Sequence, residues 1–145
     1  MKVTDKPVIV EETFDASVNE VWDAITRADR MREWFFDNIP NFKPEVGFET
    51  RFSVRSGDRV FPHRWHVQEV VPQQILRYGW KYDGYAGDAS VVFVLSKAGP
   101  GTKLELILTV LEDFPDDIPE FKRESCVAGW EYFIGERLKA YLKSP

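Results

Sequence analysis

The sequence predicts an α+β fold in which a curved antiparallel sheet of six or seven strands wraps around one long C-terminal helix, with two short helices after the first strand. Three observations lead to this prediction. Residues 12–26 have the pattern of a strand that turns directly into an amphipathic helix. Residues 129–142 have the pattern of a long closing helix, and strand-like segments occupy the interval. Since a sheet closed by one helix readily encloses a cavity, we expect a pocket between the two.

The N-terminal third predicts one strand followed by two short helices. Residues 8–14 alternate as a strand, which places Val8, Val10, Glu12 and Phe14 on one face. After it, Ser17 is expected to cap a helix, with Glu20 at the third helical position completing a capping box. Residues 29–35 indicate a second helix, and the proline-containing residues 37–46 indicate a loop.

The middle of the chain predicts a meander of five further strands. The segments are residues 47–55, 59–71, 74–82, 89–98 and 102–111. The links between them are short and rich in turn residues, which is typical of antiparallel hairpins. The only long element left to cover one face of this sheet is the closing helix.

The closing helix is predicted to begin near Pro119 and to continue to Lys143, because proline suits the first helical turn. Its apolar stripe consists of Val127, Trp130, Ile134, Leu138 and Tyr141. Gly135 flanks this stripe and is expected to allow a close approach to the sheet. Gly129 lies on the opposite side, and the pattern gives no reason for it.

Composition limits the classes of partner. Residues 1–145 are expected to form a single domain. The formal net charge of −5 argues against nucleic acid or an anionic membrane as the main partner, because both require a basic surface. Cys126 is the single cysteine, so no internal disulfide is possible. No segment resembles a signal peptide or a membrane-spanning helix, so we expect a cytoplasmic protein without membrane insertion.

Four patches of sequence share their order and spacing with a known superfamily. They are residues 14–16 with 21–24, residues 34–35, residues 67–72 with 76–80, and Gly129-Trp130 with Leu138, Tyr141 and Leu142. In these patches the chain resembles the START-like (SRPBCC) superfamily, which has the helix-grip fold of the birch-pollen allergen. Within it, the chain is most similar to the family of homologues of the activator of heat-shock chaperone ATPase. In this fold residues 34–36 lie near one mouth of a cavity, which suggests a gate or a plug.

The two histidines are expected to lie on opposite faces of one strand. Phe61, His63, Trp65, Val67 and Val71 share the more apolar face, whereas His66 is on the other. A spacing of three residues on a strand therefore does not make a metal pair. No nucleophile signature or phosphate-binding glycine loop is present in the sequence. We predict no metal, no cofactor and no assigned catalytic residue.

Aromatic side chains dominate the remaining inward faces. Leu76, Tyr78, Trp80 and Tyr82 share a strand face, and such a wall either packs as an ordinary core or lines a ligand slot. The predicted ligand-binding residues are Trp34, Phe35, Phe52, His63, Trp65, Tyr78, Trp80, Phe93, Trp130 and Ile134.

Three functions are compatible with this sequence. The leading hypothesis is binding of a small hydrophobic or aromatic molecule, lipids included, in the cavity. The second is an enzyme similar to polyketide cyclases and aromatases, which would need at least two of His63, Tyr78 and Glu12 in one pocket. Binding without catalysis is favoured over this enzyme hypothesis. The third is a module that interacts with a chaperone through an exposed surface, with the cavity filled by aromatic side chains.

Overall fold

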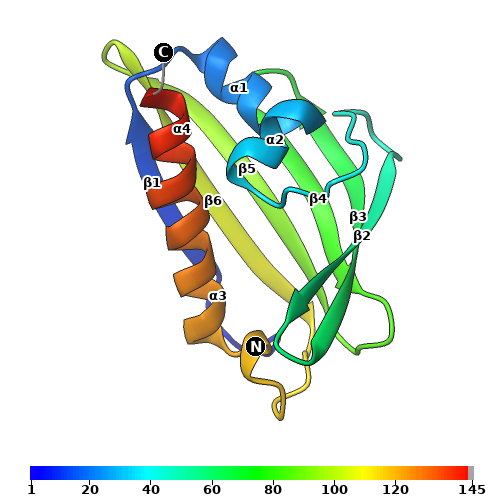
Figure 1. Cartoon of the computed structure of the whole chain (residues 1–145). Coiled ribbons are helices and arrows are strands. Elements are labelled where there is room, and N and C mark those ends of the chain that lie inside the picture. The colour runs from blue at the N-terminus through cyan, green and yellow to red at the C-terminus, as the bar shows by residue number, and fades with distance from the viewer. Residues whose placement is uncertain (144–145) are drawn as a thin grey trace.

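The computed structural model describes residues 1–143 and confirms the predicted α+β architecture. Six antiparallel strands form one curved sheet in the order β1-β6-β5-β4-β3-β2. They are β1 (Val8–Phe14), β2 (Glu49–Ser56), β3 (Arg59–Val71), β4 (Ile75–Tyr82), β5 (Asp88–Ala98) and β6 (Gly101–Glu112). The C-terminal helix lies across the concave side, and two short helices cover the end of the sheet farther from the N-terminus (Figure 1).

The two short helices follow the predicted signals closely. Helix α1 (Val18–Thr26) begins after Ser17, whose side chain accepts a hydrogen bond from the backbone N–H of Glu20 at 3.1 Å. Helix α2 (Ala28–Trp34) is fixed against α1 by the Trp34 indole N–H, which donates to the Ala24 carbonyl at 2.8 Å. Because both atoms are buried, this bond is shielded from water and links the end of α2 to α1.

A bulge in β3 corrects one expected side-chain direction. The register shifts between Val67 and Glu69, so two residues of β3 oppose one of β4 at this point. Beyond the bulge, Val70 pairs with the buried Leu76, which places Val71 on the outer face. The prediction that Val71 shares a face with His63 was therefore wrong, because a single extra residue inverts the alternation.

The C-terminal helix begins later than predicted. Pro119–Phe121 forms a separate 3₁₀ turn, η1. The extended backbone of Lys122 (φ −77°, ψ 150°) separates this turn from the helix that follows. Helix α3 (Arg123–Trp130) then continues through a π-helical segment, η2 (Glu131–Leu138), into α4 (Lys139–Lys143). Pro119 therefore does begin a helical turn, but this turn is not part of the long helix. It places Phe121 in the core.

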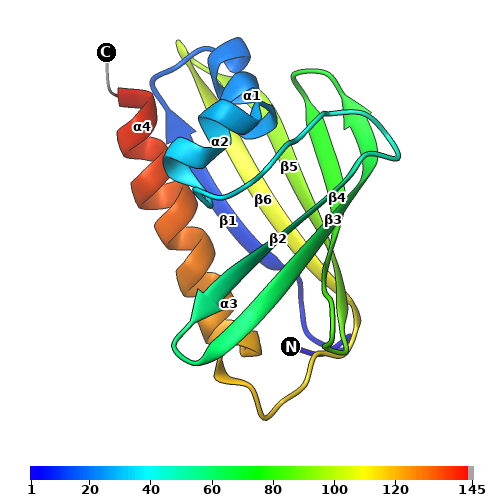
Figure 2. The ribbon, with the colours of Figure 1, turned by 45° about the vertical axis from the view of Figure 1, so that its right-hand side comes forward.

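The sheet forms one layer of the molecule and the helices form the other. The two ends of the molecule differ in how the space between these layers is filled. One end, beneath α1 and α2, is filled by buried side chains. At the other end the β2–β3 hairpin reaches across to the start of α3, and Figure 2 shows both elements near the N-terminus. No helix within residues 1–143 is both long and apolar enough to cross a membrane.

Candidate functional site

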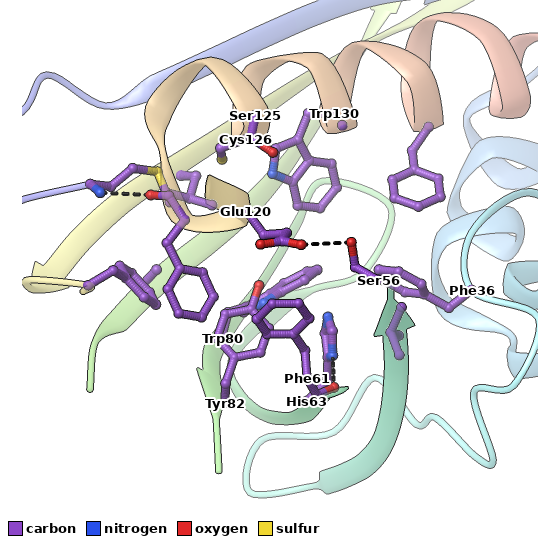
Figure 3. Close-up of a pocket in the computed structure, with 18 residues that line it drawn as sticks. Phe36, Ser56, Phe61, His63, Trp80, Tyr82, Glu120, Ser125, Cys126 and Trp130 are labelled. Carbon is purple, nitrogen blue, oxygen red and sulfur yellow. Dashed lines mark hydrogen bonds between the residues drawn. The ribbon is translucent and has the colours of Figure 1, made fainter. Parts of the chain in front are cut away.

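A cavity of about 320 Å³ lies between the sheet and the start of the C-terminal helix, at the hairpin end of the molecule. Its walls come mainly from the five strands β2 to β6, from η1 and from α3. The labelled residues of Figure 3 that line it are Phe36, Ser56, Phe61, His63, Trp80, Tyr82, Glu120, Ser125, Cys126 and Trp130. This volume lies at the lower end of the range of ligand pockets.

Aromatic rings in mutual contact form most of the wall. Tyr82 stacks on Phe121 with 5.0 Å between ring centroids, and Phe61 lies 5.3 Å from Phe121. On the helix side, Trp130 meets Trp80 edge to face at 5.5 Å. Such contacts hold each ring in a fixed orientation, so the cavity presents preformed aromatic faces.

Phe35 packs behind the cavity, against four rings that line it: Phe36, Trp80, Trp130 and Phe133. Its ring stacks on Trp34 at 4.7 Å and also lies 5.4 Å from Trp65 and 5.6 Å from Trp130. Phe35 is only 4% exposed and bridges sheet and helix, while its neighbour Phe36 lines the cavity. Of residues 34–36, which were predicted as a gate or plug, Phe36 lines the cavity, whereas Trp34 and Phe35 lie in the core.

His63 presents a hydrogen-bond acceptor to the cavity. Its Nδ1 lies 2.9 Å from the Phe61 carbonyl oxygen. Since a carbonyl only accepts, Nδ1 carries the hydrogen. Burial lowers the pKa of His63 to about 4, so the ring is neutral at pH 7 and Nε2 has a free lone pair. Figure 3 shows this second nitrogen directed away from Phe61, toward the cavity side where Glu120 lies.

Tyr82 and Cys126 add two protonated polar groups. Burial raises the pKa of the Tyr82 hydroxyl well above its ordinary value. Burial also raises the pKa of the Cys126 thiol to about 11. Both groups therefore keep their protons at neutral pH, and Cys126 has no thiolate character.

A carboxylate stands at the mouth, where the hairpin meets the helix. Glu120 Oε2 accepts a hydrogen bond from Ser56 Oγ at 2.8 Å, and Arg59 Nη1 lies 3.4 Å from Oε1. The hydrogen bond from Ser56 holds the pKa of Glu120 below its usual range, so this group is ionised. Glu120 Oε1 is shielded from solvent and has no hydrogen-bond partner within residues 1–143.

The ten predicted ligand residues divide into two groups. His63, Trp80 and Trp130 line the cavity. The other seven lie in the packed core: Trp34, Phe35, Phe52, Trp65, Tyr78, Phe93 and Ile134. Among these, the Trp65 indole N–H and the Tyr78 hydroxyl have no hydrogen-bond partner in the described part of the chain, and their rings lie 5.0 Å apart.

Several lining residues were not predicted. Phe114, Glu120 and Phe121 belong to an acidic stretch that composition alone indicates to be solvated, although its two phenylalanines signal an anchored segment. Gly129 also lines the cavity, and a Cβ added there would meet no atom within 4 Å. Gly129, for which the apolar stripe of the helix gave no reason, thus leaves open space at the cavity wall.

The three acid–base candidates do not share the cavity. His63 lines it, whereas the Tyr78 hydroxyl is enclosed in the core. Glu12 forms an ion pair with Lys139 at 2.8 Å, on the far part of the helix. Within residues 1–143 no group of three or more His, Cys, Asp or Glu side chains is arranged to hold a metal ion.

Comparison with solved structures shows the same fold in several bacterial proteins. CV1439 from Chromobacterium violaceum is 19% identical with a TM-score of 0.80, covering 96% of this chain and 98% of that chain. The Aha1 dimer from Colwellia psychrerythraea is 17% identical with a TM-score of 0.74, covering 96% and 97%. DynU16, a protein of the dynemicin biosynthetic locus, is 28% identical with a TM-score of 0.77. That match covers 97% of this chain and 48% of DynU16.

Comparison with curated proteins found no match. The family model described as "Activator of Hsp90 ATPase homolog 1-like protein" matches residues 15–143, which is nearly the whole chain, and the match agrees with the START-like architecture of this fold. The chain belongs to the family of Activator of Hsp90 ATPase homolog 1-like proteins.

Proposed function

We propose that this protein binds a small planar aromatic molecule in the cavity between the β2–β3 hairpin and α3. The observation that carries the proposal is a preformed hollow of about 320 Å³ whose wall is mostly aromatic and whose polar groups are few. The hollow holds roughly ten water volumes at about 30 Å³ each. This size favours two or three fused rings over a sterol or a long acyl chain.

The first experiment is an NMR titration of the tryptophan indole signals with naphthalene derivatives, oleate and cholesterol. Trp80 and Trp130 line the cavity, whereas Trp22 lies on α1, away from it. Saturable shifts of the first two signals with the naphthalenes, and no shift of Trp22, would support the proposal. An absence of saturable shifts at both Trp80 and Trp130 for every naphthalene would overturn it.

A cavity-filling variant makes this test specific. Gly129→Leu places a side chain where an added Cβ meets open space at the cavity wall, and we expect it to weaken naphthalene binding at least about tenfold. Ala128→Leu is the matched control, because Ala128 is exposed on the same helix and does not line the cavity. Equal weakening by both variants would contradict binding at this site.

Interaction with a chaperone is the second candidate, and the family description is what favours it. A filled cavity was expected for that function, whereas the hairpin end is open. The test is whether the purified protein stimulates the ATPase of Hsp90 or its bacterial counterpart. Stimulation that persists in Gly129→Leu would assign this activity to a surface other than the cavity.

A further inference from the structure

Two polar groups in the core, directly behind the cavity wall, lack a hydrogen-bond partner. Trp65 and Tyr78 stand on the neighbouring strands β3 and β4, and both are 0% exposed. The Trp65 indole nitrogen and the Tyr78 hydroxyl have no hydrogen-bond partner within residues 1–143, although their rings lie only 5.0 Å apart. Since nearly all buried polar groups in proteins are paired, two such groups on contacting rings require an explanation.

Packing alone does not explain these polar groups. Trp65 meets the Phe52 ring edge to face at 4.8 Å, and Tyr78 lies 5.8 Å from both Phe42 and Phe93. A phenylalanine ring offers no lone pair to an N–H or O–H group. A phenylalanine at position 78 would fill the same space without a buried hydroxyl, so the hydroxyl costs stability in this core.

Both groups are hydrogen-bond donors. An indole N–H can only donate. Burial raises the pKa of the Tyr78 hydroxyl well above its ordinary value, so this group also keeps its proton at neutral pH and offers it. The matching group on a ligand is an acceptor that brings neither a donor nor a charge into the core. The carbonyl oxygen of a ketone or a quinone meets both conditions.

One ring of the cavity wall, Phe36, is placed to open a path to these donors. Phe36 and Trp80 both line the cavity, and both also pack against Trp65, with 6.2 Å and 5.0 Å between ring centroids. Trp80 is held within β4, whereas Phe36 is half-buried and belongs to residues 35–48, which contain no helix or strand. A movement of the Phe36 ring therefore leaves the sheet unchanged and would extend the cavity toward Trp65.

On these grounds, and resting on the proposed function, we infer that the protein binds neutral aromatic ligands that carry a carbonyl group, whose oxygen accepts hydrogen bonds from Trp65 and Tyr78. The ring system of the ligand occupies the hollow, and its carbonyl group passes the displaced Phe36 ring into the core. Trp65 and Tyr78 are thus specificity-determining residues, although neither of them lines the cavity as it stands.

Two ligands of the same shape test this inference by calorimetry at pH 7: 2-acetylnaphthalene and 2-isopropenylnaphthalene. The second replaces the carbonyl oxygen by a CH₂ group. Transfer from water to purely apolar surroundings favours the hydrocarbon, because the ketone loses its hydrogen bonds to water. We expect the ketone to bind at least as tightly as the hydrocarbon, since the two donors replace those bonds. A ketone that binds more weakly than the hydrocarbon would overturn the inference while leaving the proposed site intact. If neither ligand binds, the proposed function itself is wrong.

The variant Tyr78→Phe separates a role in binding from a role in folding. It should bind the ketone about tenfold more weakly and the hydrocarbon within about twofold of the wild type. Its urea midpoint should rise, because the hydroxyl that it loses has no partner. A lower midpoint would show that the hydroxyl already has a partner, such as an enclosed water, and would overturn the inference. Tyr85→Phe is the control, because the Tyr85 hydroxyl donates to the Val60 carbonyl and this residue does not line the cavity. An equal loss of ketone affinity in the control would also contradict the assignment.

The variant Phe36→Ala tests the path. Stopped-flow quenching of tryptophan fluorescence should show the ketone associating at least about tenfold faster than with the wild type, because no ring has to move first. Phe48→Ala is the control, since Phe48 is half-buried in the same segment but does not line the cavity. Equal association rates for the wild type and Phe36→Ala would refute the movement of Phe36.

A measurement on the wild type keeps the inference testable if a variant does not fold. In NMR spectra the indole N–H proton of Trp65 should move downfield when the ketone binds, as expected for a new hydrogen bond, and should not do so with the hydrocarbon. The same response of this proton to both ligands would overturn the role of Trp65.

Discussion

Lowering the pH should destabilise this protein through His63, and the substitution His63→Asn should remove that part of the pH dependence. The ring is 4% exposed and is surrounded by Phe36, Phe52, Trp80 and Tyr82. These rings offer a positive charge no hydrogen-bond acceptor comparable to water. Burial therefore lowers the pKa of His63 from 6.5 to about 4.

The size of the effect follows from the two pKa values. At pH 8 the imidazole is neutral in both the folded and the unfolded chain, and its titration contributes nothing. Below about pH 6.5 the unfolded chain takes up a proton that the folded chain does not, so the free energy of unfolding falls as the pH falls. The loss is complete near pH 4, where the folded state also binds the proton. At about 1.36 kcal/mol for each pKa unit, the total is roughly 3 kcal/mol.

Urea unfolding of the wild type and His63→Asn from pH 8 to pH 4 measures this loss. Asparagine does not titrate, and its amide can replace Nδ1 as donor to the Phe61 carbonyl. Acidic side chains titrate in both proteins and cancel in the difference, which should change by roughly 3 kcal/mol across this range. His66→Asn is the control, because His66 is exposed. Parallel stability curves for the wild type and His63→Asn would refute the reasoning.

Three further outcomes are expected. Gly129→Ala should raise the free energy of unfolding by about 1 kcal/mol in urea titrations, since alanine favours the helix and its Cβ meets open space; no gain would contradict this. Gly101→Ala should lower it by about 2 kcal/mol or more, because an added Cβ overlaps the backbone oxygen of Phe14, and a neutral result would disprove that contact. At pH 8 iodoacetamide should alkylate Cys126 about a hundredfold more slowly in the folded than in the urea-unfolded chain, since burial raises the thiol pKa from 9.0 to about 11. Rates within a few-fold of each other would exclude a buried thiol.

The fold could be predicted because its signals are local and repeat along the chain. The capping box at Ser17 and Glu20 and the alternation of the strands each specify one element, and the short links specify how the strands pair. The structure differs from the predicted fold at two places, and at each of them a single residue changes the backbone geometry. The bulge after Val67 inverts the alternation of β3, and Lys122 separates the turn at Pro119 from the helix.

The cavity was harder to predict because alternation shows which side chains point inward, but not whether other atoms fill the space between them. His63, Trp80 and Tyr78 all face inward, yet only the first two border the hollow. Tyr78 instead packs against the rings of Trp65 and Phe93 and of Phe42, which comes from a loop far away in the sequence. The partnership of Ser56 and Glu120, 64 positions apart, likewise depends on where the hairpin meets η1.

The presence of a hollow beside a packed core has a consequence for how this protein can change during evolution or engineering. The half of the molecule beneath α1 and α2 is a solid core, where the loss of a large side chain typically costs about 2–5 kcal/mol. The hairpin half already contains a void, so substitutions such as those at Gly129 alter the shape of the void without leaving a new gap. A substitution at Gly129 can therefore change the shape of the hollow without removing a side chain from the core. The shape of the hollow can thus vary at this position while the composition of the core stays the same.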